Sequence, residues 1–246
     1  MKKANWRIVL ALSLMVASGL LYCLQIVVFR HPSDTFFYMV QDLAFVPIQV
    51  LLVTLVVNEM LARREKSLLQ QKMNMVIGAF FVEMGNDLLA NFARLDLRAD
   101  EMRQHMHICL DWSERDFANA RRSIRKHSYA LKGDSTAFRQ LKDLLTERKT
   151  TLLRLLENPN LLEHESFTDV LWAVCHLNEE LEYRSCLDDL PDTDLAHLEG
   201  DAERAYRELI SEWLSYVAHL KSQYPYMFSL VLRTNPFDPE AAVTLR

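Results

Sequence analysis

Histidine and acidic residues gather between residues 163 and 180, and they are the side chains of this chain best suited to chemistry. Carboxylates and imidazoles bind metal ions, and helical bundles hold pairs of iron ions through Glu and Glu-x-x-His side chains on facing helices. The same groups transfer protons as general acids and bases. The candidate residues for a metal site or an acid-base site are Glu163, His164, Glu165, His176, Glu179 and Glu180.

The spacing of these residues does not favour a metal site. No Glu-x-x-His occurs in the sequence, and its nearest counterpart is Asp194-x-x-His197. His105 and His107 are two residues apart, which turns them about 200° from each other on a helix, so they cannot bind one ion together. Solvated acids and hydrogen bonds between helices explain the same residues without a ligand, and we expect no cofactor.

Known catalytic motifs are missing as well. The sequence contains no Gly-x-x-x-x-Gly-Lys phosphate loop, no Gly-x-Gly-x-x-Gly, no His-Glu-x-x-His and no Gly-x-Ser-x-Gly. We therefore name no catalytic residue, and a role without catalysis is favoured. A helical enzyme stays an alternative, and the acid and base groups between residues 163 and 176 are its candidate site because they meet at a predicted helix junction.

Two long apolar stretches stand at the start of the chain. Residues 8–29 form a run of 22 residues without a charge, and residues 36–61 contain few polar side chains. A helix of that length rises about 33 Å, enough to cross a hydrocarbon core of roughly 30 Å. A cleaved signal peptide is the alternative, but its apolar region is usually only about 7–15 residues long. We predict a transmembrane hairpin in residues 1–61, with spans at about 8–29 and 36–58.

Basic residues flank this hairpin on one side. They are Lys2, Lys3 and Arg7 before the first span, and Arg63, Arg64 and Lys66 after the second. Because basic residues concentrate on the cytoplasmic side of a membrane, we expect both termini in the cytoplasm and the protein in the bacterial inner membrane. The four cysteines have no Cys-x-x-Cys spacing, and three fall in the cytoplasmic part, so we expect no disulfide.

A few polar residues interrupt the spans. Asp42 lies about two turns into the second span, Gln49 follows seven residues later on nearly the same face, and Pro47 can kink the helix between them. A carboxylate in hydrocarbon is costly, which makes Asp42 a functional candidate. One interpretation is a small homo-oligomeric channel lined by the second span. The favoured one is that Asp42 reaches the interface or pairs with Gln25 or His31 and fixes the hairpin.

The rest of the chain predicts helices. The whole sequence has only 5 Gly and 7 Pro, and no window after residue 60 alternates apolar and polar residues as strands do. Capping-box patterns at Ser113-x-x-Asp116 and Ser166-x-x-Asp169 predict two helix starts. We predict an all-α fold, with an amphipathic helix leaving the membrane at 62–96, a cytoplasmic multi-helix bundle at 97–234 and a tail at 235–246.

Residues 195–220 carry the most regular apolar pattern. Steps of three and four residues join Leu195, Leu198, Ala202, Ala205, Leu209, Trp213, Tyr216 and Leu220. Such a seam packs against a partner helix, as in a coiled coil. Packing within its own domain is favoured, and self-association of the protein through this helix or through the spans is the alternative.

Charge is divided between two neighbouring segments. Residues 115–154 contain 11 Lys or Arg and 4 acids, whereas residues 157–204 contain 14 acids and 2 bases. Mutual neutralisation of these helices is favoured, and binding of anionic lipid or a phosphorylated ligand is the alternative. The candidate residues for such binding are Arg121, Arg122, Arg125 and Lys126. Nucleic acid is not expected, because the net charge is −5 and aromatic residues are not interleaved with the basic ones.

Residues 155–172, with the run Glu-Asn-Pro-Asn, and residues 224–239, with the run Tyr-Pro-Tyr-Met-Phe-Ser, resemble a group of uncharacterised bacterial two-span membrane proteins. This resemblance implies no activity. We expect a membrane-anchored helical scaffold, or a sensor that relays a signal, with the lipid bilayer and a protein bound at the cytoplasmic bundle as its partners. The alternatives are the channel and a helical metal-binding protein or enzyme.

Overall fold

The protein is built of helices, as its sequence predicts. The computed structural model describes residues 2–29, 32–161 and 164–244. In these ranges, the only pairing of extended segments is one isolated antiparallel bridge between Asp96 and Leu131. The predicted all-α fold is therefore confirmed. The chain divides into two compact units, Met1–Lys66 and Ser67–Arg246.

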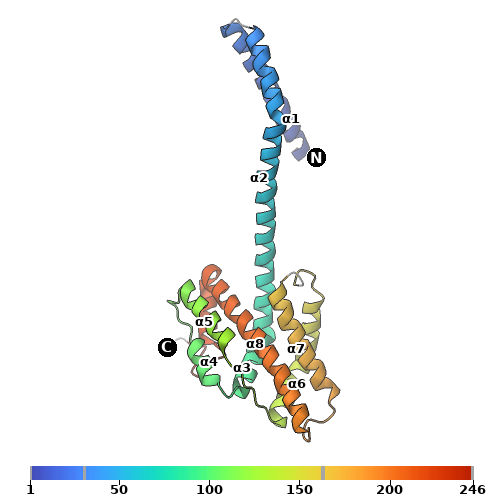
Figure 1. Cartoon of the computed structure of the whole chain (residues 1–246), viewed down its shortest axis with the longest axis vertical. Coiled ribbons are helices and arrows are strands. Elements are labelled where there is room, and N and C mark those ends of the chain that lie inside the picture. Colours follow the sequence, from blue (N-terminus) through green and yellow to red (C-terminus); the bar gives the residue numbers. More distant parts are fainter. Residues whose placement is uncertain (1, 30–31, 162–163, 245–246) are drawn as a thin grey trace. The chain divides into compact units, whose positions relative to one another are not determined.

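The first unit contains helix α1 (Lys2–Phe29) and the first part of helix α2 (Pro32–Phe80) (Figure 1). The two helices are joined by a hydrogen bond in which Tyr22 Oη donates to Asp42 Oδ2 over 3.2 Å. Asp42 therefore has a partner on α1 that the sequence did not suggest, and His31, one of its two suggested partners, lies outside the described residues. Pro47 lies inside α2, which continues as an α-helix on both sides of it.

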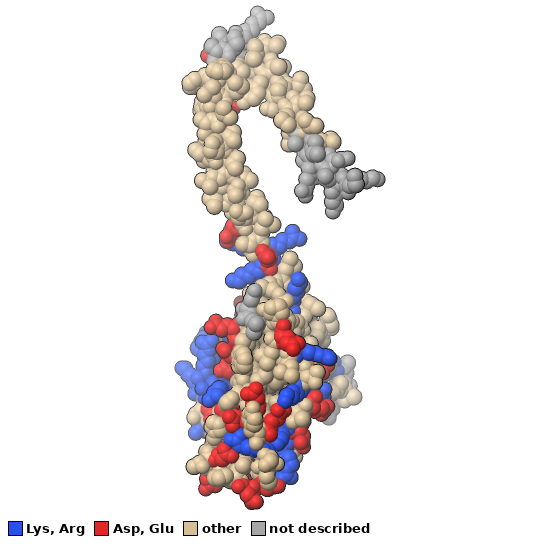
Figure 2. Space-filling model, turned by 90° about the vertical axis from the view of Figure 1, so that its right-hand side faces the viewer, with Lys and Arg blue, Asp and Glu red and all other residues tan. Residues whose placement is uncertain are grey.

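The large apolar side chains of the first unit are exposed. One helical run in the described part of the chain, Asp34–Leu95, is long and apolar enough to cross a membrane, and its most apolar window has a mean hydropathy of 2.0 and no buried residue. The apolar run Leu12–Val28 is shorter. Figure 2 shows few charged side chains along most of the described part of this unit, in contrast to the second unit. The predicted hairpin therefore has one span that meets these criteria.

The second unit contains the end of α2 and eight further helical elements within its described residues. They are the π-helix η1 (Phe81–Gly85), α3 (Asn86–Leu95), α4 (Ala99–His105), α5 (Glu114–Lys126), α6 (Ser135–Leu156), α7 (Glu165–Tyr183), α8 (Asp192–Gln223) and α9 (Pro225–Arg233). Helix α8 lies at the centre, because α3, α5, α7 and α9 all pack against it (Figure 1).

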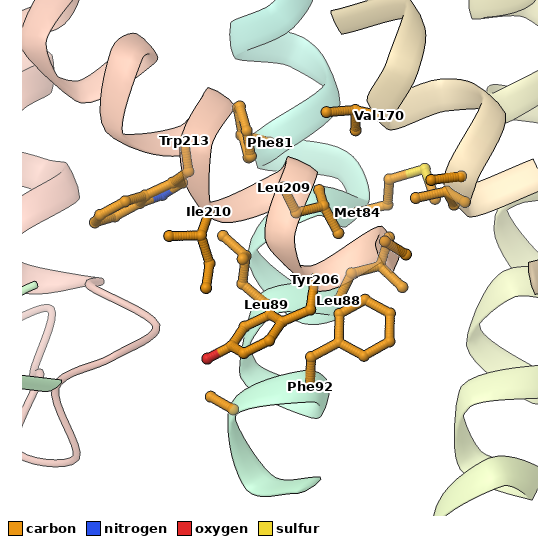
Figure 3. Close-up of a cluster of buried hydrophobic side chains, with 14 of the residues drawn as sticks. Phe81, Met84, Leu88, Leu89, Phe92, Val170, Tyr206, Leu209, Ile210 and Trp213 are labelled. Atoms are coloured by element: carbon orange, nitrogen blue, oxygen red, sulfur yellow. The ribbon is translucent and has the colours of Figure 1, made fainter. Parts of the chain in front are cut away.

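The core forms around the predicted seam of α8. All of its residues are buried except Leu195, which is partly buried against the same core. Figure 3 shows Tyr206, Leu209 and Trp213 of α8 among Phe81 of the π-helix and Phe92 of α3. The predicted packing of this seam within its own domain is confirmed.

Local sequence signals explain several helix ends. The capping box at Ser113 and Asp116 is present and starts α5, and Asp134 caps α6 by accepting a hydrogen bond from Ala137 N over 2.8 Å. The second predicted capping box is wrong. Helix α7 is capped by His164, whose Nδ1 accepts from Phe167 N over 3.3 Å, because Ser166 Oγ instead donates to Glu212 on α8.

Helices α4 and α5 end at His105 and Lys126. Beyond α5 the chain is extended, and Leu97 N donates to Ala130 O over 3.0 Å while Lys132 N donates to Leu95 O over 2.9 Å. These contacts with the end of α3 satisfy backbone groups that a longer helix would have paired internally.

His219 on α8 is a titratable side chain within this packing. Its Nδ1 lies 3.2 Å from Asn74 Nδ2, and its Nε2 is buried without a hydrogen-bond partner in the described residues. Burial lowers the pKa of His219 below its usual value. Because the unfolded chain then takes up this proton more readily than the folded protein, ionisation of His219 leaves stability unchanged well above about pH 6.5 and destabilises the folded state as the pH falls below that value.

We expect replacement of Gly85 by Ala to destabilise the protein by about 1–3 kcal/mol. A Cβ at this position would lie 2.5 Å from Phe81 Cδ1 and 2.9 Å from Phe80 Cε1, and both rings are fully buried. Gly200→Ala is the control, because nothing lies within 4 Å of its Cβ and alanine stabilises a helix interior by about 0.5–1 kcal/mol. Chemical unfolding of the full-length protein in detergent measures both, and equal effects would refute this packing.

We expect the His219→Gln variant to lose less stability than the unmodified protein between pH 7.5 and pH 5.5. Glutamine can still bond to Asn74 but cannot take up a proton in this range. Chemical unfolding at each pH gives the difference in free energy of unfolding, which should shrink as the pH falls. His105→Gln, which removes an exposed histidine, is the control. Parallel pH profiles for His219→Gln and the unmodified protein would contradict the effect.

Candidate functional site

Helices α7 and α8 bring two histidines and two carboxylates together. His176 and Glu180 are four residues apart on α7, and His197 and Asp201 are four residues apart on α8. Residues at this spacing lie on one face of a helix, one turn apart. The helices run antiparallel, so that His176 contacts Asp201 and Glu180 contacts His197.

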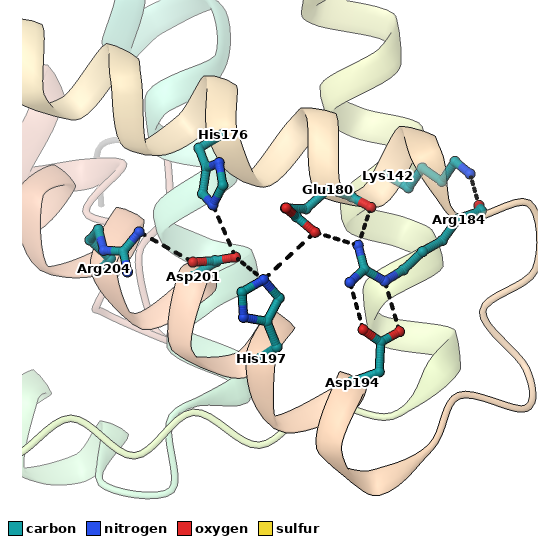
Figure 4. A network of polar contacts seen from close by, with 8 residues as sticks. All are labelled: Lys142, His176, Glu180, Arg184, Asp194, His197, Asp201 and Arg204. Atoms are coloured by element: carbon teal, nitrogen blue, oxygen red, sulfur yellow. Dashed lines mark hydrogen bonds and ion pairs between the residues drawn. The ribbon is translucent and has the colours of Figure 1, made fainter.

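The four side chains converge on one point (Figure 4). Asp201 Oδ2 lies 3.4 Å from His176 Nε2 and 3.3 Å from His197 Nε2. Glu180 Oε2 lies 3.7 Å from His197 Nε2. One nitrogen or oxygen atom of each residue lies within 4.8 Å of the corresponding atom of every other. Their atom types are those that bind transition-metal ions.

Asp201 is the buried member of this group. Its side chain is 4% exposed, whereas those of His176 and His197 are 43% and 52% exposed. Asp201 Oδ1 lies 3.2 Å from Arg204 Nη1. Its other oxygen, Oδ2, accepts no hydrogen bond from the described residues, even though two imidazole nitrogens are within 3.5 Å. The ring nitrogens therefore do not point directly at this oxygen.

Arg184 holds Glu180 in place. Its Nη1 lies 2.7 Å from Glu180 Oε2, and its Nε and Nη2 donate to the two oxygens of Asp194 over 2.9 and 2.6 Å. Lys142 Nζ donates to the backbone oxygen of Arg184 over 2.8 Å and restrains the chain at the end of α7. The hydrogen bonds from Arg184 lower the pKa of Glu180 and of Asp194, so both carboxylates are ionised at neutral pH.

A surface groove adjoins the cluster at His176. Its volume is about 460 Å³, and its lining consists of Asp169, Trp172, Ala173, His176, Arg204 and Glu208. Trp172 is 60% exposed, and burial, with a smaller contribution from the charge of Asp169, raises the pKa of Glu208. The groove therefore makes the cluster accessible from solvent.

Only two of the six predicted metal or acid-base candidates belong to this cluster, namely His176 and Glu180. His164 caps α7, while Glu165 and Glu179 are exposed elsewhere on that helix. Glu163 lies outside the described residues. The sequence reasoning missed Asp201 and did not connect His197 with α7. The signal was a His-x-x-x-Glu on one helix and a His-x-x-x-Asp on the next.

A second buried histidine has too few neighbours for metal binding. His127 Nε2 lies 3.5 Å from Asp96 Oδ2, and its Nδ1 lies 3.8 Å from Glu101 Oε2. The two carboxylates thus contact opposite nitrogens of one ring and do not share a point in space. We interpret this pair as part of the packing between the end of α3 and the segment after α5.

The basic residues between 115 and 154 differ in whether they form ion pairs. On α6, Arg139 pairs with Asp188, and Lys149 Nζ lies 2.6 Å from Glu182 Oε2, so the predicted neutralisation by the acidic segment is confirmed there. The α5 residues Arg121, Arg122, Arg125 and Lys126 form no ion pair within 4.0 Å in the described part of the chain, and all but Arg121 are exposed.

Comparisons with known proteins identify relatives of unknown activity. A family model described as the MJ1433 N-terminal helical domain matches residues 2–61, and one described as the C-terminal helical domain of the uncharacterized protein MJ1433 matches residues 69–233. The uncharacterized protein MJ1433 of Methanocaldococcus jannaschii is 39% identical over 243 residues, covering 99% of this chain and 98% of the relative. No solved structure matches. This relative is archaeal, so the expected bacterial membership finds no support.

We expect Arg184→Lys to destabilise the protein by about 1–3 kcal/mol, because lysine cannot form the paired hydrogen bonds that Arg184 donates to Asp194 while it also binds Glu180. Arg103→Lys is the matched control, since Arg103 forms a single exposed pair with Asp100 that contributes at most about 1 kcal/mol. Chemical unfolding of both full-length variants measures the difference. Equal stability of the two variants would show that the Arg184 network does not stabilise the fold.

Proposed function

The chain belongs to the family of the uncharacterized protein MJ1433, and we propose that it is a membrane-anchored helical protein that acts as a scaffold or relays a signal. In this proposal, residues 1–61 form a transmembrane hairpin in the cytoplasmic membrane, and both termini lie in the cytoplasm. The helical domain then faces the cytoplasm, where it binds a partner.

The observation that carries this proposal is the exposed apolar surface of the first unit. Large apolar side chains are exposed on all sides of its helices, including Leu20 at 65% and Leu43 at 69%. Water-soluble monomers rarely expose contiguous apolar patches of more than a few hundred Å². A second protein copy would cover one side of such helices, whereas lipid covers every side. Burial in a bilayer therefore accounts for this surface best.

The role as a scaffold or relay rests on the continuity of α2. This helix runs from Pro32 to Phe80 without interruption, and its last turns place Ile77 and Phe80 in the core of the second unit. It is followed at once by a π-helix, an element that often marks functional sites. A change in the membrane part of α2 would thus act on residues that hold the helical domain together.

The basic residues of α5 are the part of the domain most suited to an acidic partner. Arg122, Arg125 and Lys126 are exposed and carry no ion pair within the described residues. Each basic residue near an anionic bilayer surface contributes about 1 kcal/mol to binding. We propose this face for anionic lipid headgroups or a phosphorylated ligand.

A homo-oligomeric channel lined by α2 is a weaker alternative. Its main candidate residue, Asp42, accepts a hydrogen bond from Tyr22, which gives its carboxylate a role in joining α1 and α2. Gln49 is exposed on α2, and Gln25 is half-buried on α1. Within the described residues, the geometry that could support an enzymatic role is the cluster between α7 and α8.

We expect residues 33 and 67 to lie on opposite sides of the membrane. In a variant without its native cysteines, Ser33→Cys should react with a membrane-impermeant thiol reagent in intact cells. Ser67→Cys should react only after the cells are permeabilised. Both residues are serines, Ser33 three residues before the proposed second span and Ser67 nine residues after it, so the pair is matched in chemistry.

Extraction of the membranes with alkaline carbonate provides the control, because an anchored protein stays with the lipid pellet. Recovery of the full-length protein in the soluble fraction would contradict membrane anchoring. Labelling of both cysteines in intact cells would contradict the proposed orientation.

A further inference from the structure

We propose that His176, Glu180, His197 and Asp201 form a binding site for a divalent transition-metal ion, for which Zn²⁺ is the probe. The proposal does not depend on membrane anchoring, because all four residues lie on α7 and α8. A metal ion at this point would link the two helices at the surface of the helical domain.

The distances fit a tetrahedral ion. Ligand nitrogen and oxygen atoms at about 2.0–2.2 Å from Zn²⁺ lie about 3.3 Å from one another in a tetrahedral site. Asp201 Oδ2 lies 3.3 and 3.4 Å from the Nε2 atoms of His197 and His176. Two of the three separations among these atoms therefore already match those that a shared ion requires, and all the ligand atoms lie within 4.8 Å of one another.

The absence of hydrogen bonds to Asp201 Oδ2 also supports a metal ion at this point. Asp201 Oδ2 is buried and accepts no hydrogen bond from the described residues, although both imidazoles are close enough to donate one. Nitrogens that bind a common ion point at the ion and therefore past the neighbouring ligand atom. The ring orientations thus suit a cation placed between the three atoms better than direct hydrogen bonds.

Two other buried carboxylates of α8 accept hydrogen bonds from side-chain donors, as buried acids usually do. Glu199 accepts from Lys132 Nζ over 2.7 Å, and Glu212 accepts from Ser166 Oγ over 2.8 Å. Buried polar atoms in proteins nearly always have such partners, because an unpaired one loses the hydrogen bonds that water provided. Asp201 Oδ2 departs from this pattern, and a bound cation would satisfy it.

The charge of the four side chains and the types of their ligand atoms favour a divalent transition-metal ion. Two carboxylates and two neutral imidazoles carry a charge of −2, which a divalent cation neutralises. Imidazole nitrogen suits Zn²⁺ and its neighbours in the first transition row, whereas Mg²⁺ and Ca²⁺ take oxygen ligands. Glu180 Oε2, which lies 3.7 Å from His197 Nε2, also accepts a hydrogen bond from Arg184 Nη1 over 2.7 Å. A carboxylate oxygen has two lone pairs, so Oε2 can keep this hydrogen bond and bind the ion as well.

The test is a calorimetric titration of the chelator-treated, full-length protein in detergent with Zn²⁺. We expect one ion per chain, and binding weakened about 100-fold or more by His176→Ala, His197→Ala or Asp201→Asn, since even residues outside the ligand set change affinity about 10–100-fold. His105→Ala removes an exposed histidine elsewhere and should bind Zn²⁺ as the unmodified protein does. Circular dichroism checks that each variant is folded.

Titration with Co²⁺ gives a second readout, because tetrahedral Co²⁺ absorbs visible light far more strongly than the octahedral aqueous ion. We expect these bands with the unmodified protein and their loss with His197→Ala. If Asp201→Asn does not fold, the variants His176→Ala and His197→Ala still test the proposal, because both histidines are half-exposed. Absence of Zn²⁺ binding, or equal binding by the histidine variants, would show that the cluster is only a network of ion pairs.

Discussion

The structure of the helical domain depends on the burial of one face of α8. This helix has 32 residues and is therefore about 48 Å long, and its seam from Leu198 to Leu220 is buried along nearly its full length. Helices α3, α5, α7 and α9 each bury apolar side chains against it. Burial of apolar area stabilises such packing by about 25 cal/mol per Å² but does not by itself fix how the helices are aligned.

Polar contacts on α8 provide this alignment. Glu199 binds Lys132 in the segment before α6, and Glu212 binds Ser166 at the start of α7. Trp213 Nε1 donates to Asn86 Oδ1, at the start of α3, over 3.1 Å. A shift of α8 by one turn would leave each of these partly or fully buried groups without its partner, at a cost of about 1–3 kcal/mol per group. The same alignment places Asp201 opposite His176.

Local patterns were sufficient to predict much of this fold. The seam at 195–220 and the capping box at Ser113 are properties of single helices, and both were read correctly. The cap of α7 was wrong because Ser166 is used by Glu212, a residue 46 positions away. The cluster at Asp201 was missed for the same reason. It depends on the alignment of two antiparallel helices, and the search for Glu-x-x-His excluded the spacing of four that both helices use.

The burial pattern of helix α2 changes along its length. From residue 36 to residue 61 its side chains are exposed on every face, and most are apolar. From Met73 onward, burial recurs every three or four residues, at Met73, Ile77 and Phe80, and continues through Met84 and Leu88 in the elements that follow. A helix that packs on protein has one buried face, whereas a helix in lipid needs none. The change of pattern within one continuous helix separates a part whose apolar side chains are exposed from a part that packs in the second unit, and the exposed part is the observation on which the proposed membrane anchoring rests.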